Sequence, residues 1–324
     1  MKLFRWIGLL LAALLQMGGA GAAESMPAVA VVAPLASRAP LVAVTRAGSR
    51  LVALGDEGVV ISSADGRTWK QARQVPYDGL LNAACFTDAQ HGWAVGYGGV
   101  ILSSADGGET WQLRQRMGQG AVLLSVACVD KTRVIVVGAY GKALQTRDGG
   151  DTWTALQIGQ GADADLHLNA ILLTRKGSLM VAAEGGAVFR SVDDGKHWAR
   201  VKTPATGSLW GALVLHDGRL LMYGMSGRIV LSQDDGESWQ SLDGGTREAL
   251  TGATQLDDGR VVLVGNGGVV TVSAPTSLDF TVQVRPDRQA LAAVAASSAG
   301  DLVVFGAQGA STQQIGSGRA AISR

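Results

Sequence analysis

The 324-residue sequence contains few charged residues, few aromatic residues and no long apolar run beyond its first 22 positions. Charged residues make up 17% of the chain and aromatic residues 5%. No segment after residue 22 approaches the roughly 20 consecutive apolar residues of a membrane-spanning helix. The 28 basic and 27 acidic residues nearly balance, whereas binding to nucleic-acid phosphates needs a basic excess. We therefore expect a mature chain that neither spans a membrane nor binds nucleic acid.

The sequence also lacks the common catalytic and metal-binding motifs. Its four histidines lie far apart, with no H-x-x-x-H or Cys/His spacing. No G-x-S-x-G nucleophile motif occurs, and no phosphate-binding loop. We expect no catalytic residue, no metal and no cofactor.

Residues 1–22 have the three parts of a secretory signal peptide. Lys2 and Arg5 form a basic start, residues 7–15 an apolar core, and residues 20–22 a small-residue cleavage site. Removing the two basic residues leaves 26 basic against 27 acidic residues in the mature chain. Because no cysteine lies near the cleavage site, a lipid anchor is not indicated. The sequence predicts a periplasmic or secreted protein.

A small hydroxyl residue followed by Asp, Gly and Trp recurs five times. The five tryptophans are 42, 42, 45 and 41 residues apart, a period typical of a stacked or radial array of one small unit. We expect Asp to accept hydrogen bonds from turn amides and Trp to cover the turn. A group present in every repeat builds the repeat, whereas a catalytic group is needed only once. The structural pairs are Asp65 and Trp69, Asp106 and Trp111, Asp148 and Trp153, Asp193 and Trp198, and Asp234 and Trp239.

A second marker, glycine at G-x-x-G spacing, shows that there are seven units. The first positions are 55, 96, 138, 183, 224, 265 and 306, with alanine at 183. Each unit, about 41 residues long, reads as four short strands; in the second these are 81–86, 92–95, 100–104 and 110–114. The pattern predicts an all-β fold, a seven-bladed β-propeller with four-stranded blades.

Four segments follow from this division of the chain. They are a signal peptide at 1–22, a closing strand and lead-in at 23–39, the propeller at 40–314 and a C-terminal tail at 315–324. The seventh unit ends at 311–314 without a good fourth strand. The β-prone run at 28–32 is predicted to supply the outer strand of that last blade and so to close the ring.

The two cysteines, Cys85 and Cys128, fall near the same place in neighbouring repeats. Equivalent side chains of adjacent repeats point the same way, whereas a disulfide needs Cβ atoms about 3.8 Å apart. The sequence favours buried free thiols. A disulfide, which export would permit, is the alternative.

The repeated phrase resembles the Asp-box, or BNR, repeat of sialidases and sortilin-type receptors. The fuller pattern at 81–86, 92–96 and 99–111 resembles, more specifically, the Ycf48/Hcf136 family. Members of that family are exported seven-bladed propellers that assist photosystem II assembly, and relatives in other bacteria often accompany resistance-nodulation-division exporters. The resemblance covers about residues 40–314. It implies a non-enzymatic scaffold or assembly factor whose partners are subunits of a membrane-protein complex.

We expect the docking surface on the propeller face that carries the G-x-x-G turns, because these turns differ from blade to blade. Aromatic and Arg side chains are common energetic anchors of interfaces. The candidate binding residues of an expected monomer are Tyr97, Tyr140, Glu184, Met225, Asn266, Arg114 and Arg116.

Two alternatives remain at the level of the sequence. One is a glycan hydrolase of the sialidase-like Asp-box type, which would need a Tyr nucleophile supported by Glu and an Asp acid/base. None of Tyr77, Tyr97, Tyr140 and Tyr223 has a recognisable setting for that role. The other alternative is a module that binds a glycan or small ligand in the central channel.

Overall fold

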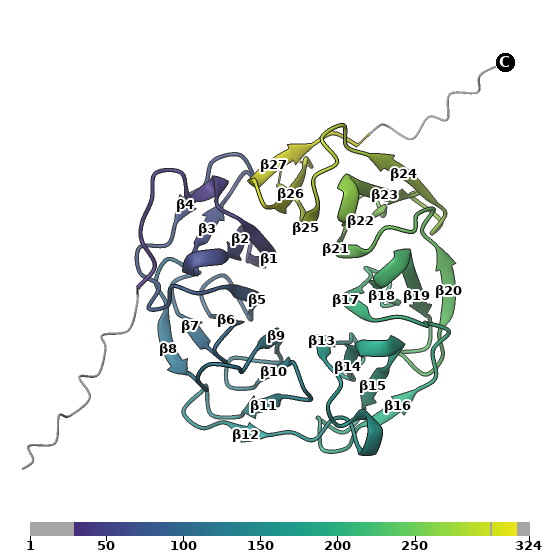
Figure 1. The fold of residues 1–324 in the computed structure, drawn as a ribbon, viewed down its shortest axis with the longest axis horizontal. Helices are drawn as coiled ribbons and strands as arrows, with labels where there is room; N and C mark the ends of the chain where they lie inside the picture. Colours follow the sequence, from purple (N-terminus) through teal and green to yellow (C-terminus); the bar gives the residue numbers. More distant parts are fainter. Residues whose placement is uncertain (1–28, 299, 316–324) are drawn as a thin grey trace, which may run out of the picture.

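A computed structural model describes residues 29–298 and 300–315 as a ring of seven antiparallel sheets around a central opening (Figure 1). Six sheets have four strands in chain order, from the innermost to the outermost, and the seventh has three. The predicted all-β, seven-bladed propeller is confirmed. The predicted signal peptide lies outside the described residues. Within them, no helix has the length and apolar character needed to cross a membrane.

The innermost strands line the central opening, and each begins with a buried leucine. They are β1 (Leu41–Ala47), β5 (Leu81–Phe86), β9 (Leu123–Cys128), β13 (Leu168–Leu173), β17 (Leu209–Val214), β21 (Leu250–Gln255) and β25 (Leu291–Ala296).

The second strands are the most apolar, because sheets cover them on both faces. Nearly every residue in them is buried, as in any strand without a solvent face. They are β2 (Arg50–Gly55), β6 (Gly92–Gly96), β10 (Val134–Gly138), β14 (Leu179–Ala183), β18 (Leu220–Gly224), β22 (Val261–Gly265) and β26 (Leu302–Gly306).

The third strands follow the G-x-x-G turns, and the fourth strands are short, polar and mostly exposed. The third strands are β3 (Val60–Ser63), β7 (Ile101–Ser104), β11 (Ala143–Thr146), β15 (Val188–Ser191), β19 (Arg228–Ser232), β23 (Val269–Ser273) and β27 (Gly309–Gln313). The fourth strands are β4 (Lys70–Gln71), β8 (Gln112–Gln115), β12 (Thr154–Ala155), β16 (Ala199–Val201), β20 (Gln240–Asp243) and β24 (Phe280–Val284).

Single 3-10 turns complete the described elements. Four of them form G-x-x-G turns, and the other two lie in connections. They are η1 (Ala36–Arg38), η2 (Asp56–Gly58), η3 (Gly161–Asp163), η4 (Glu184–Gly186), η5 (Met225–Gly227) and η6 (Asn266–Gly268).

The hydrophobic interior consists of seven separate layers, one between each pair of neighbouring blades. The layer between blades 7 and 1 joins Leu51 and Ile61 of blade 1 to Val303 and Phe305 of blade 7. Burial of apolar surface between blades therefore closes the ring.

Each Asp-box is a compact hydrogen-bonded turn between the third and fourth strands. In blade 2, the Ser104 hydroxyl donates to Asp106 at 2.9 Å and accepts from the Gly108 amide at 2.9 Å. The other carboxylate oxygen of Asp106 accepts from the Thr110 hydroxyl at 2.6 Å. The Trp111 indole donates to the Gly108 carbonyl at 3.0 Å. Equivalent hydroxyl-to-carboxylate bonds occur in the other four boxes.

The Asp-box tryptophans also contribute to the layers between blades. Trp69 of blade 1 meets Phe305 of blade 7 edge-on, with ring centres 5.6 Å apart. Trp153 of blade 3 meets Trp93 of blade 2 in the same way at 5.8 Å. In these cases the Asp-box of one blade packs its tryptophan against the preceding blade.

The Asp-box carboxylates should make stability depend on pH in the acid range. The Thr152 hydroxyl lowers the pKa of Asp148 from 3.8 to about 2, and the Ser238 hydroxyl does the same for Asp234. A lowered folded-state pKa stabilises the fold fully above the unfolded-state value, and this contribution disappears as pH falls through the folded-state value. We expect a constant Tm from pH 7 to 5 and a falling Tm from about pH 4 to 2, measured by thermal melts. The fall in Tm between pH 4 and pH 2 should be smaller in Asp148→Asn than in the parent protein. A Tm of the parent protein that does not change in acid would contradict the prediction.

The predicted closing strand is wrong. The described part of the 28–32 run does not pair with β27 but lies against blade 1 (Figure 1). The Gln71 side-chain amide donates to the Val31 carbonyl at 2.8 Å and accepts from the Ala33 amide at 2.7 Å, while the Ala30 amide donates to the Val75 carbonyl at 3.0 Å. The Gln71 side chain and one main-chain hydrogen bond thus hold the segment beside the outer strand of the first blade. The chain then passes through η1 over the β26–β27 turn before entering β1.

The preference for free thiols is also wrong, because Cys85 and Cys128 form a disulfide with Cα atoms 5.8 Å apart. Cys85 pairs with Trp93 of the second strand, and Trp93 is three residues before Gly96. Cys128 pairs with Val134, which is four residues before Gly138. The cysteines therefore occupy adjacent, not equivalent, positions. Because neighbouring residues of a strand point to opposite faces, Cys85 faces forward and Cys128 faces back, into the layer between blades 2 and 3.

Candidate functional site

The G-x-x-G turns place exposed side chains around one end of the central opening. Tyr97 is 49% exposed, Tyr140 70% and Met225 46%. Glu184 and Asn266 are exposed on the equivalent turns of blades 4 and 6. Each of these turns follows the second strand of its blade, so the topology brings all five predicted residues to the same face of the ring (Figure 1).

Tyr140 occupies a backbone position that favours glycine. It is the third residue of its turn and has φ of +53°, a left-handed conformation that costs a residue with a Cβ about 1–2 kcal/mol. Blades 2, 4 and 6 carry Gly98, Gly185 and Gly267 at this position, whereas blades 1 and 5 carry Glu57 and Ser226 with the same left-handed backbone. The Tyr140 ring meets the His167 ring edge-on, with centres 4.8 Å apart. A strained, exposed aromatic residue is characteristic of a binding surface.

Arg116 is connected to Tyr97 through Tyr77, which contacts both residues. The Tyr77 hydroxyl donates to the Tyr97 carbonyl at 2.8 Å, and the Arg116 guanidinium lies over the Tyr77 ring, 5.9 Å from its centre. Arg114 is placed differently. It lies in the outer strand β8 and donates to the Ser103 hydroxyl at 2.7 Å, so the structure does not bring it together with the other candidates.

Trp210 is an exposed aromatic residue at the channel that the sequence did not indicate. It is the second residue of β17 and is 38% exposed. At the same position in other blades, Asn82 and Asn169 donate from their amides to the carbonyl of the next blade's first leucine, at 2.7 and 2.9 Å. Tryptophan at this position leaves an apolar ring at the channel wall. A comparison of the residues that follow each strand-initiating leucine would have identified it.

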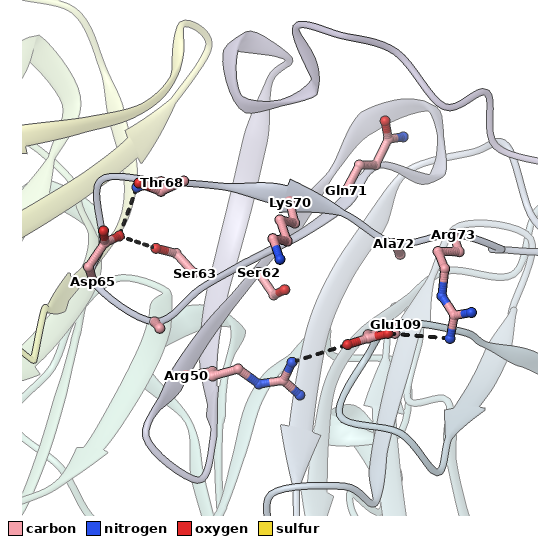
Figure 2. Close-up of a pocket in the computed structure, with 11 residues that line it drawn as sticks. Arg50, Ser62, Ser63, Asp65, Thr68, Lys70, Gln71, Ala72, Arg73 and Glu109 are labelled. Atoms are coloured by element: carbon pink, nitrogen blue, oxygen red, sulfur yellow. Dashed lines mark hydrogen bonds and ion pairs between the residues drawn. The ribbon is translucent and has the colours of Figure 1, made fainter.

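A second candidate is a polar groove of about 480 Å³ on the outer side of blades 1 and 2 (Figure 2). Glu109 stands between two arginines, 3.7 Å from Arg50 and 3.3 Å from Arg73. Lys70 also lines the groove, without an ion pair in the described part of the chain. These ion pairs connect the two blades, and they are exposed enough to contribute little to stability.

Two of the four tyrosines have settings that disfavour a role as catalytic nucleophile. Tyr77 and Tyr223 are buried, and burial raises the pKa of both hydroxyls, which opposes their use as nucleophiles. Across residues 29–298 and 300–315, no three His, Cys, Asp or Glu side chains gather as metal ligands would.

Seven blades, five of which carry an Asp-box between the third and fourth strands, define the class of BNR, or Asp-box, β-propellers. Within that class, the family model "Photosynthesis system II assembly factor YCF48" matches residues 61–121 and 115–313. The chain belongs to this family, as the sequence resemblance indicated. A search among curated proteins finds no match.

Solved structures share the fold at low sequence identity. "YCF48 bound to D1 peptide" has a TM-score of 0.66 and 18% identity, and the match covers 84% of this chain and 92% of that one. "YCF48 from Cyanidioschyzon merolae" has a TM-score of 0.65 and 16% identity, covering 84% and 94%. A streptogramin B lyase has a TM-score of 0.73 and 11% identity, covering 86% and 95%. The same fold thus occurs in an enzyme.

Proposed function

We propose that this protein is an exported, non-enzymatic scaffold that binds a subunit of a membrane-protein complex during assembly. Membership of the YCF48 family carries the proposal, because a relative with this fold has been solved with a bound D1 peptide. The photosystem II assembly role and the accessory role in a resistance-nodulation-division exporter differ only in which complex is bound. The Cys85–Cys128 disulfide supports export, since disulfides persist mainly in oxidising compartments.

The G-x-x-G face is the surface best suited to this binding. It presents Tyr97, Tyr140 and Met225 with large exposed areas, and Trp210 lies at the adjoining channel wall. Exposed aromatic and methionine side chains are enriched at protein interfaces. The buried settings of Tyr77 and Tyr223 support binding over glycoside hydrolysis.

Replacing the two exposed tyrosines should abolish partner capture while leaving the fold intact. We suggest Tyr97→Ala with Tyr140→Asn, because asparagine tolerates the left-handed conformation at position 140. Loss of two aromatic anchors should weaken binding by about 30-fold or more. The measurement is chemical crosslinking in intact cells, followed by purification of this protein and mass spectrometry of the crosslinked partners.

The control is Val192→Ala, since Val192 is 67% exposed but lies on the Asp-box side of the ring. It should leave the capture of partners unchanged. Recovery of a photosystem II or exporter subunit would identify the complex. Equal capture by the double variant would exclude this face as the docking surface, and turnover of fluorogenic glycosides would contradict the non-enzymatic assignment.

A further inference from the structure

The seventh blade ends in an unpaired strand. Blades 1–6 each have a fourth strand of two to five residues, whereas the last sheet stops at β27, on the outside of the ring (Figure 1). Within residues 29–298 and 300–315, no segment pairs with the outer side of β27. The segment predicted to do so is held against blade 1 by Gln71. Blade 7 is therefore one strand short of its neighbours.

The register identifies which backbone groups of β27 face outward. The Val60 carbonyl of blade 1 accepts from the Ala72 amide at 2.8 Å, and the Ala143 carbonyl of blade 3 accepts from Leu156 at 2.9 Å. Val60 lies opposite Leu54, Ala143 opposite Val137, and Ala310 opposite Phe305, in each case the residue just before the end of the second strand. By this equivalence, the amide and carbonyl groups of Ala310 and Thr312 point away from β26.

The composition of β27 does not protect this edge against pairing. Exposed edge strands usually carry a charged side chain, a proline or a bulge that prevents another strand from adding. The strand Gly309–Gln313 has neither charge nor proline, and it pairs with β26 without an irregularity in register. Ser311 and Thr312 are exposed and small, so an added backbone could approach closely.

A groove of about 500 Å³ runs beside this edge, and its lining includes Ala310, Ser311 and Thr312 of β27 together with Trp69 and Arg38. Arg67, also in the groove, is paired with Asp301. Arg38 is exposed, and the described part of the chain gives it no ion pair. Among the residues that the structure describes, the groove therefore offers a cation without an ion pair next to a row of unpaired backbone donors and acceptors.

We propose that β27 accepts an extended peptide of the membrane-protein partner as a fourth strand, with a carboxylate of that peptide on Arg38. Strand addition derives affinity from main-chain hydrogen bonds, and charge-assisted hydrogen bonds make Arg a specific carboxylate receptor. This inference rests on the proposed function for the existence of such a partner, and it adds a binding surface separate from the G-x-x-G face.

The test places a photoreactive amino acid at Ser311 of the full-length protein in cells, and in a second strain at Tyr97. Crosslinks from Ser311 to an extended segment of a membrane protein would support strand addition. Crosslinks from Ser311 to residues 316–324 of the same chain, or to a second copy, would overturn it. Capture from Tyr97 alone would also overturn it while leaving the proposed function standing. Capture from neither position would count against both.

A synthetic peptide with the sequence of the crosslinked segment then tests the geometry on the purified protein. Thr312→Pro removes the outward amide donor at a position where an edge strand tolerates proline, and should weaken peptide binding at least tenfold. Thr312→Val keeps the amide and should bind as the parent does. Arg38→Gln should weaken binding several-fold, and Arg38→Lys should restore most of it. Unchanged affinity in Thr312→Pro, with an unchanged Tm, would overturn strand addition.

Discussion

Breaking the Cys85–Cys128 disulfide is expected to lower the free energy of unfolding by about 4 kcal/mol. The bond closes a loop across a sequence separation of 43 residues, and a loop of that length restricts the unfolded chain by about this amount. For a protein of this size, the change corresponds to a Tm lower by about 6 °C. Thermal melts with and without dithiothreitol measure it.

The double variant Cys85→Ala/Cys128→Ala provides the control, because reductant should not change its Tm any further. Its Tm should lie close to that of the reduced parent protein. A loss of less than about 1 kcal/mol in the free energy of unfolding on reduction would contradict the prediction. It would show that packing alone holds blades 2 and 3 together and that the disulfide adds little to stability.

Phe305→Ala is expected to destabilise the protein by about 3–5 kcal/mol. Phe305 is fully buried in the layer between blades 7 and 1, and its ring meets Trp69. Truncation of a buried Phe to Ala costs this much through lost transfer energy and the cavity left behind. The described residues contain no strand shared between the first and last blades, so side-chain packing bears most of the closure. Urea denaturation followed by tryptophan fluorescence measures the change.

Phe280→Ala is the matched control, since it removes the same atoms from the partly buried outer strand β24 of blade 6. Phe280→Ala should lower the free energy of unfolding by less than half as much as Phe305→Ala does. Equal losses in the two variants would indicate that closure between blades 7 and 1 is no more sensitive than any other layer.

The architecture could be predicted from the sequence because its determinants repeat. Seven G-x-x-G turns at a period near 41 define seven blades, and an apolar second strand in each requires sheets on both sides. Features that occur only once in the ring could not be predicted from the repeat. The 28–32 run has the β propensity of a strand, but its position depends on the amide of Gln71, a contact that no pattern of hydrophobicity records.

The disulfide and the candidate site also depend on details that differ from one repeat to the next. The repeat alignment placed Cys85 and Cys128 at nearly equivalent positions of neighbouring blades, but a difference of one residue in register reverses the direction of the second side chain. Comparison of turns identified Tyr97 and Tyr140 as exposed, but the left-handed backbone of Tyr140 and the position of Trp210 at the channel wall became clear only with the structure. Side-chain direction is decided by local register, which an average repeat does not resolve.

The closure of the ring has a consequence for the order of folding during synthesis. Arg67 and Asp301, which join the first blade to the last, are 234 positions apart in the chain. A chain that emerges from its N-terminus presents blade 1 long before blade 7 exists, whereas blades 2 and 3 are already complete and can be joined by their disulfide. The face of blade 1 that packs on blade 7, with Leu51, Ile61 and Trp69, must therefore stay uncovered until residues 291–313 have been made. Completion of blade 7 is therefore the step that commits the nascent protein to its closed native form.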